Sequence, residues 1–312
     1  MKGNRWTLPI VLMALTFLST FLVGAGMVPG MEFSPVPILG EIPTRPWEGA
    51  WFALPLMAIL LAHEFGHFIA GTRHGVDISP PYFIPMPMFL LGTMGAVIRM
   101  RGAIRTRDAL LDVGASGPLA GLTVALPVLV FGIWTSPIAP LPEGEAFLIE
   151  GRSPLYLALL YLLKGPIPEG HDIFLNPTAF AGWAGLLVTM INLIPVGQLD
   201  GGHVAYALFG PRQNTYGRRI LRALPVLAIV VSVYYMLDEY LAGASQPRVL
   251  SEAFAGMHWL LWAGLLALMG RFAGAGHPPT EDDTLSRGRR VVAWVTLLLF
   301  PILFMPAWLR QG

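Results

Sequence analysis

Residues 60–71 read LLAHEFGHFIAG and place two histidines and a glutamate inside an otherwise apolar run. His63, Glu64 and His67 form the pattern HExxH. Residues four apart lie on the same face of an α-helix, so the two imidazoles can bind one Zn²⁺ ion while the glutamate takes a proton from a water on the metal. The alternative is a polar packing cluster between helices, but ionisable residues in apolar segments usually have a function. The pattern therefore predicts a zinc site.

The composition indicates a polytopic membrane protein. Hydrophobic residues make up 54% of the 312 residues and charged residues 12%, against roughly 25% charged in soluble domains. A net charge of +1 gives no reason to expect a nucleic-acid partner, and the absence of cysteine excludes disulfides and thiolate ligands. We expect an all-α membrane protein with about six to seven transmembrane helices, because crossing a bilayer takes ~20 apolar residues. The apolar runs lie at 8–27, 49–71, 113–135, 178–196, 223–241, 255–273 and 291–308.

The charges near these runs predict an orientation. The first run is longer than the apolar region of a secretory signal, which is usually ~7–15 residues, so we expect a retained helix. If the seven helices alternate, about three quarters of the 20 Lys and Arg residues fall on the side of the N-terminus. That side is then cytoplasmic. His63, His67 and the segment 192–203 are all expected at the cytoplasmic ends of their helices.

A hydrolytic zinc site needs a third protein ligand and one open position. Residues 192–203, NLIPVGQLDGGH, bring Asp200 to the membrane depth expected for the histidines, followed by two glycines that let backbone approach closely. Asp200 is the predicted third ligand. The alternatives are that Asp200 only caps a helix or that His203 binds the metal instead.

Residues 79–101 cannot form one continuous helix. Pro80, Pro81, Pro85 and Pro87 interrupt it, and TMGAVIRM at 93–100 is typical of a strand. We expect a re-entrant strand or hairpin beside the metal, whose edge could pair with an extended substrate. The alternative is a cytoplasmic loop that rests on the membrane interface.

A further segment predicts only helix packing. Gly114, Gly117 and Gly121 share one face of the run at 113–135, and small residues so spaced allow helices to pack closely in lipid.

Four motifs in order resemble the site-2 protease family of intramembrane zinc metalloproteases, in its branch without a PDZ domain. They are HEFGH, PYFIP…GTMGAVIRMRG, DVGASGPLAGL and NLIPVGQLDGGH, and the resemblance covers roughly residues 50–210. It implies one Zn²⁺ ion per chain on His63, His67 and Asp200, with Glu64 as general base and acid. It also implies that Asn192 steadies the substrate carbonyl or the oxyanion. A side-chain amide one to two turns before the third ligand can donate in that way, although it could equally bond to a neighbouring helix.

We therefore expect a metalloendopeptidase that hydrolyses peptide bonds within or near the transmembrane segment of a single-pass membrane protein. We expect a single integral membrane domain over 1–312, with a catalytic core at 47–210 and additional C-terminal helices at 211–312. The expected location is a prokaryotic plasma membrane, with the active-site side cytoplasmic. One alternative is a divalent-cation transporter, which would not explain the glutamate of HExxH. The other is a non-catalytic relative that binds membrane proteins, which would be expected to lack Glu64 or a ligand.

Overall fold

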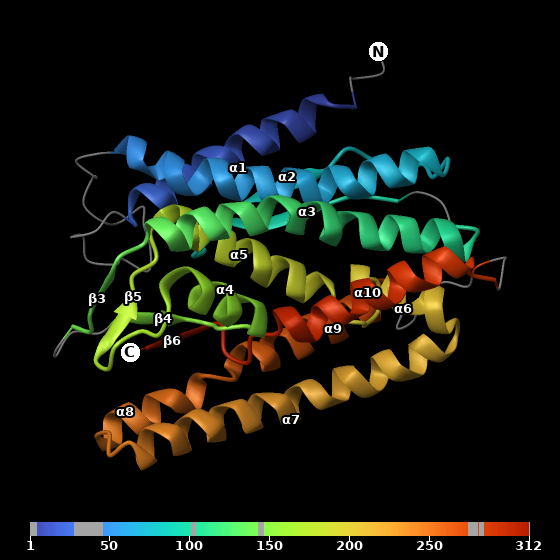
Figure 1. Ribbon diagram of the computed structural model, residues 1–312. Coiled ribbons are helices and arrows are strands. Elements are labelled where there is room, and N and C mark those ends of the chain that lie inside the picture. The colour runs from blue at the N-terminus through green and yellow to red at the C-terminus, as the bar shows by residue number, and fades with distance from the viewer. Residues whose placement is uncertain are drawn as a thin grey trace. The chain divides into compact units, whose positions relative to one another are not determined.

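The computed structural model describes residues 5–27, 46–100, 104–142, 147–273, 280 and 284–311. Most of the described chain is helical (Figure 1). The helices are α1 (Thr7–Ala25), η2 (Pro46–Gly49), α2 (Ala50–Arg73), α3 (Arg107–Thr135), α4 (Pro154–Lys164), α5 (Pro177–Asn192), α6 (Asp200–Phe209), α7 (Arg212–Leu241), α8 (Gln246–Ser251), η3 (Glu252–Phe254), α9 (Met257–Ala273) and α10 (Arg287–Leu303). The short strands are β1 (Tyr82–Pro85), β2 (Thr93–Val97), β3 (Ile138–Pro140), β4 (Leu148–Glu150), β5 (His171–Ile173) and β6 (Leu309–Gln311).

The predicted class, a helical membrane protein with a short hairpin, is confirmed. Each of the seven predicted apolar runs contains a helix. In the described part of the chain, five helical segments are long and apolar enough to cross a membrane: 7–25, 46–73, 107–135, 212–241 and 246–271. Two of the predicted spans are shorter helices, α5 with 16 residues and α10 with 17. The run predicted to end at 196 stops as a helix at Asn192, because Pro195 disfavours helical backbone before it.

Backbone contacts divide the chain into two compact units, which are described separately. The first comprises 1–105, 112–139 and 160–189. Within it, α2 and α3 run side by side (Figure 1), and their backbones approach closely where residues are small. A Cβ atom added at Gly66 of α2 would lie 2.5 Å from the carbonyl oxygen of Ser116. Gly182 of α5 packs as closely against Leu129 of α3. These contacts hold three apolar helices together without large side chains between them.

The first unit also contains the predicted hairpin. Strands β1 and β2 pair antiparallel, with Tyr82 opposite Val97 and Phe83 opposite Ala96. Ser19 of α1 donates a hydrogen bond of 2.6 Å from Oγ to the carbonyl oxygen of Gly92, just before β2. The hairpin is thereby fixed to the first helix of the chain. Whether its edge receives a substrate stays a prediction.

The second unit comprises 106–111, 140–159 and 190–312. Its helices α7 and α9 run antiparallel, and the chain meets α7 just before α9 begins, where a Cβ atom at Gly256 would overlap the backbone of Ala228. Near the C-terminus, Arg310 forms an ion pair of 3.3 Å with Glu252 and lies 3.9 Å above the ring of Tyr235. The predicted division into a core at 47–210 and additional helices at 211–312 stays a prediction.

Candidate metal centre

The histidines of HExxH lie on α2 within the first unit, and they are buried together with Glu64. The ring of His67 is held by a hydrogen bond of 2.7 Å between its Nδ1 and the carbonyl oxygen of Val113 on α3. A carbonyl can only accept, so Nδ1 carries the proton and Nε2 keeps its lone pair. Metal-binding histidines are typically oriented by such a bond from the nitrogen that does not bind the metal.

The two imidazoles lie close together at their Nε2 atoms. The Nε2 atoms of His63 and His67 lie 3.2 Å apart, and the planes of the rings make an angle of 73°. Two nitrogens that bind one tetrahedral Zn²⁺ ion at about 2.05 Å would be about 3.3 Å apart. The pair thus fits the distance that a single zinc ion requires.

Two glycines of α3 leave the space in which these rings lie. A Cβ atom at Gly117 would overlap the ring of His67, and one at Gly121 would lie 3.1 Å from the Cβ atom of His63. The sequence predicted close helix packing for this face and nothing more. The structure shows that the opposing face of α2 is the one with the histidines, a fact that spacing along α3 could not reveal.

Asp200 and Asn192 belong to the second unit and flank a tight turn. Asn192 is the last residue of α5 and Asp200 the first of α6, and both are partly exposed. A Cβ atom at Gly201 would overlap the carbonyl group of Leu193, as the two predicted close-approach glycines suggested. The residue at the N-cap position of α6 is Leu199, so Asp200 is not the cap.

The side chains of His63, His67 and Asp200 form a group that could hold one metal ion. Their ligand atoms all lie within 4.8 Å of one another. The donor set of two imidazole nitrogens and one carboxylate oxygen is typical of catalytic zinc sites, which keep a fourth position open. His203 is buried on α6 but is not part of this group.

The fold and the site together define the class of this protein. It is a helical membrane protein with a candidate metal centre of two histidines and one carboxylate. The sequence profile of peptidase family M50 matches residues 51–234, and the chain belongs to that family. The predicted resemblance to site-2 proteases is thereby confirmed.

Curated relatives carry names that agree with this family. The chain is 35% identical over 189 residues to the rice (Oryza sativa subsp. indica) protein named probable zinc metalloprotease EGY2, chloroplastic, an alignment that covers 58% of this chain and 32% of the relative. It is 34% identical over 267 residues to the Arabidopsis thaliana protein named probable zinc metalloprotease EGY1, chloroplastic. That alignment covers 82% of this chain and 43% of the relative. The chain therefore spans about a third of the length of the EGY2 protein. No solved structure matches the chain.

The relatives bear on the predicted location in one respect. The apolar helices identify a membrane protein. The names of these relatives refer to the chloroplast, so they give no support to a prokaryotic plasma membrane.

Proposed function

We propose that this chain is a zinc-dependent intramembrane endopeptidase. The observation that carries the proposal is the pair of Nε2 atoms 3.2 Å apart, with His67 oriented through Nδ1 by the carbonyl of Val113. Both histidines lie on a helix that is long and apolar enough to cross a membrane. Membership of peptidase family M50 favours hydrolysis over cation transport, and the presence of Glu64 beside His63 argues against a non-catalytic relative.

Each residue of the site has a distinct role in this proposal. His63, His67 and Asp200 would hold the ion, which when bound lowers the pKa of a water towards ~7 and polarises a carbonyl. Glu64, which is buried, accepts the proton of the attacking water and then delivers it to the leaving amine. Asn192 donates its side-chain N–H to the oxyanion that develops on the substrate.

The substrate we propose is a single-pass membrane protein. A helical substrate shields its carbonyls in its own hydrogen bonds, so the segment to be cut must be extended. Among the described residues no third strand pairs with the hairpin β1–β2, so an extended segment could pair with one of its edges. Met94 and Val97 of β2 are more than half exposed and could contact apolar substrate side chains.

We further propose that the site lies near the cytoplasmic side. The support is the excess of Lys and Arg residues on that side when the predicted helices alternate. A protease accessibility assay on membrane vesicles of known orientation tests this. Tags placed in the loops before α2 and after α9 should be cut from opposite sides.

The function is tested by measuring zinc content and cleavage on the same purified full chain. Wild type, Glu64→Gln and Asp200→Asn are compared in detergent, with a labelled transmembrane peptide as substrate. We expect wild type to hold about one zinc ion and to cleave, Glu64→Gln to keep the zinc ion without cleaving, and Asp200→Asn to lose affinity for zinc.

Two results would contradict the proposal. Cleavage by Glu64→Gln at the wild-type rate would show that the activity belongs to a contaminant or to another mechanism. Failure of wild type to bind zinc would show that the 3.2 Å separation of the rings is only a hydrogen bond between them.

A further inference from the structure

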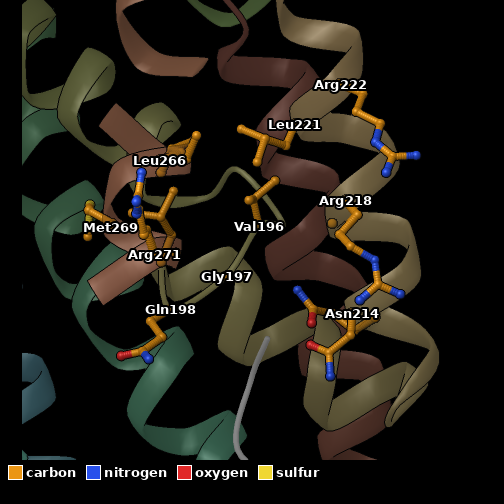
Figure 2. Close-up of a pocket in the computed structure, with 15 residues that line it drawn as sticks. Val196, Gly197, Gln198, Asn214, Arg218, Leu221, Arg222, Leu266, Met269 and Arg271 are labelled. Atoms are coloured by element: carbon orange, nitrogen blue, oxygen red, sulfur yellow. The ribbon is translucent and has the colours of Figure 1, made fainter. Parts of the chain in front are cut away.

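A pocket lies in the second unit, and none of its lining residues belongs to the HExxH helix α2. Its volume is about 390 Å³, within the range of ~300–1,000 Å³ that is usual for small-molecule sites. It is enclosed by the turn 196–199 before α6, the first three turns of α7 and the last turns of α9 (Figure 2). The mechanism proposed above uses none of the residues that line it.

Three arginines contribute to the wall of this pocket. Arg218 and Arg222 lie one turn apart on α7, and Arg271 of α9 comes from the other side of the pocket (Figure 2). Within the described residues none of the three contacts a carboxylate, and Arg218 donates only to Oγ1 of Thr215, at 3.4 Å. The site is therefore attractive to an anion.

Arginines near the opposite end of α7 do have carboxylate partners. There, Arg248 pairs with Glu239 at 3.1 Å and Arg310 with Glu252 at 3.3 Å. Arg248 and Arg310 therefore have acidic partners, whereas the three exposed arginines at the pocket have none among the described residues, so their charge is open to an anionic ligand.

A buried side-chain amide indicates a second property of the ligand, a hydrogen-bond donor. Gln213 is only 1% exposed and lines the pocket. Its Nε2 faces the carbonyl oxygen of Pro195 at 3.4 Å, which directs Oε1 away from that carbonyl. Oε1 is buried and has no hydrogen-bond donor among the described residues. A buried acceptor left in this way is unfavourable, so a ligand that supplies an O–H group would be favoured.

Much of the remaining wall is apolar, although Gln198 and Asn214 also line the pocket. Val196, Leu199, Leu221, Leu266 and Met269 line the pocket, and both long helices around it are candidate membrane spans. A ligand that satisfies all three features has an anionic group, a hydroxyl group and an apolar body. A basic pocket between membrane helices is a known kind of binding site for phospholipid headgroups.

We propose that this pocket binds an anionic glycerophospholipid with a hydroxyl-bearing headgroup, such as phosphatidylglycerol. The phosphate contacts Arg218 and Arg222 at the rim of the pocket, a headgroup hydroxyl donates to Oε1 of Gln213, and the apolar walls cover the first methylene groups. Free phosphate would leave those walls without a partner, which favours the lipid. The turn 196–199 leads directly into Asp200, so the lipid braces the start of α6. The proposal does not depend on peptidase activity.

The test is a lipid titration of the purified full chain in neutral detergent, read by native mass spectrometry. Phosphatidylglycerol is compared with phosphatidylcholine and with phosphatidylmethanol, an anionic phosphodiester without a headgroup hydroxyl, and inorganic phosphate serves as competitor. The variants are the double substitution Arg218→Gln with Arg222→Gln, the single substitution Gln213→Leu, and Arg219→Gln. Arg219 is the matched control, because it is an exposed arginine of α7 that does not line the pocket.

We expect one phosphatidylglycerol molecule to bind more tightly than phosphatidylcholine. A basic residue near an anionic lipid contributes about fivefold in affinity, so the double variant should bind about 25-fold more weakly while Arg219→Gln stays within twofold of wild type. Gln213→Leu should weaken the binding of phosphatidylglycerol and leave the binding of phosphatidylmethanol unchanged, which separates loss of the acceptor from a general structural effect.

Three outcomes would overturn the proposal. The first is equal binding of phosphatidylglycerol and phosphatidylcholine, which would mean that no headgroup is recognised. The second is an equal loss of affinity in the double variant and in Arg219→Gln, which would mean a diffuse charge effect. The third is displacement by inorganic phosphate at the same concentration as the lipid, which would identify a site for soluble phosphate.

Discussion

The substitution Gly117→Ala tests whether the metal centre depends on a glycine that never touches the metal. Replacing glycine by alanine inside a helix normally favours the helix by up to about 1 kcal/mol. Here the sign should reverse, because the added Cβ atom would overlap the ring of His67 on the neighbouring helix. The ring has to turn or move away before the alanine can fit.

The magnitude follows from what the ring loses when it moves. The hydrogen bond of 2.7 Å from Nδ1 of His67 to the carbonyl of Val113 is lost, at about 1 kcal/mol. Overpacking in a close-packed interior adds about 1–3 kcal/mol. After the helix gain of about 1 kcal/mol is subtracted, about 1–3 kcal/mol remains, which corresponds to about 5- to 150-fold weaker zinc binding. Loss of an orienting partner usually weakens metal binding by about 10–100-fold, which lies in the same range.

The assay is competition for zinc between the purified protein and a fluorescent chelator. Two further glycines give a graded comparison. Gly121→Ala brings Cβ to 3.1 Å from the Cβ atom of His63, a contact that small shifts relieve, so zinc affinity should fall less than for Gly117→Ala. In α9, a Cβ atom added at Gly264 would lie in open space, so Gly264→Ala should leave the zinc affinity unchanged. Zinc affinity of Gly117→Ala equal to that of Gly264→Ala would refute the reasoning.

Three further predictions follow from the proposed zinc site. Gly201→Ala should weaken zinc binding about tenfold, because its Cβ overlaps the carbonyl of Leu193 and α6 must shift together with Asp200; unchanged affinity in the same competition assay would contradict this. Asn192→Ala should lower kcat by about 10²–10³ with KM and zinc content unchanged in steady-state kinetics, whereas a change in KM alone would indicate substrate binding. Removal of the metal with a chelator should abolish peptide cleavage, and added Zn²⁺ should restore it; cleavage by metal-free protein would exclude a zinc mechanism.

Local patterns in the sequence were sufficient for much of the fold. The spacing within His63–His67 depends only on the helix repeat, so it predicted two imidazoles on one face before any tertiary contact was known. The prolines before Thr93 excluded a continuous helix by their own backbone geometry, and the hairpin β1–β2 lies there. The end of α5 was predicted four residues too late, at 196 instead of Asn192, because apolar character continues through a turn that Pro195 enforces.

Other features of the site depend on contacts between residues that are far apart in the sequence, and the helical repeat cannot predict such contacts. The carbonyl of Val113 that orients His67 is 46 positions away along the chain. A carbonyl is also present in every residue, so no residue type marks it in the sequence. The pocket beside α7 is similar, since Gln213 is unremarkable in the sequence and becomes informative only through its burial and its bond to Pro195.

A backbone carbonyl as the partner of His67 also changes how substitutions near the site should be interpreted. If a side chain oriented the imidazole, a substitution of that residue would remove the bond directly. Here no side-chain change at position 113 removes the acceptor, and the bond depends on where α3 lies relative to α2. That position is set by small residues at the crossing, Gly66 on one helix and Gly117 on the other. The glycines of α3 are therefore part of the metal centre in an energetic sense, because they hold the carbonyl at the distance that keeps Nε2 available for zinc.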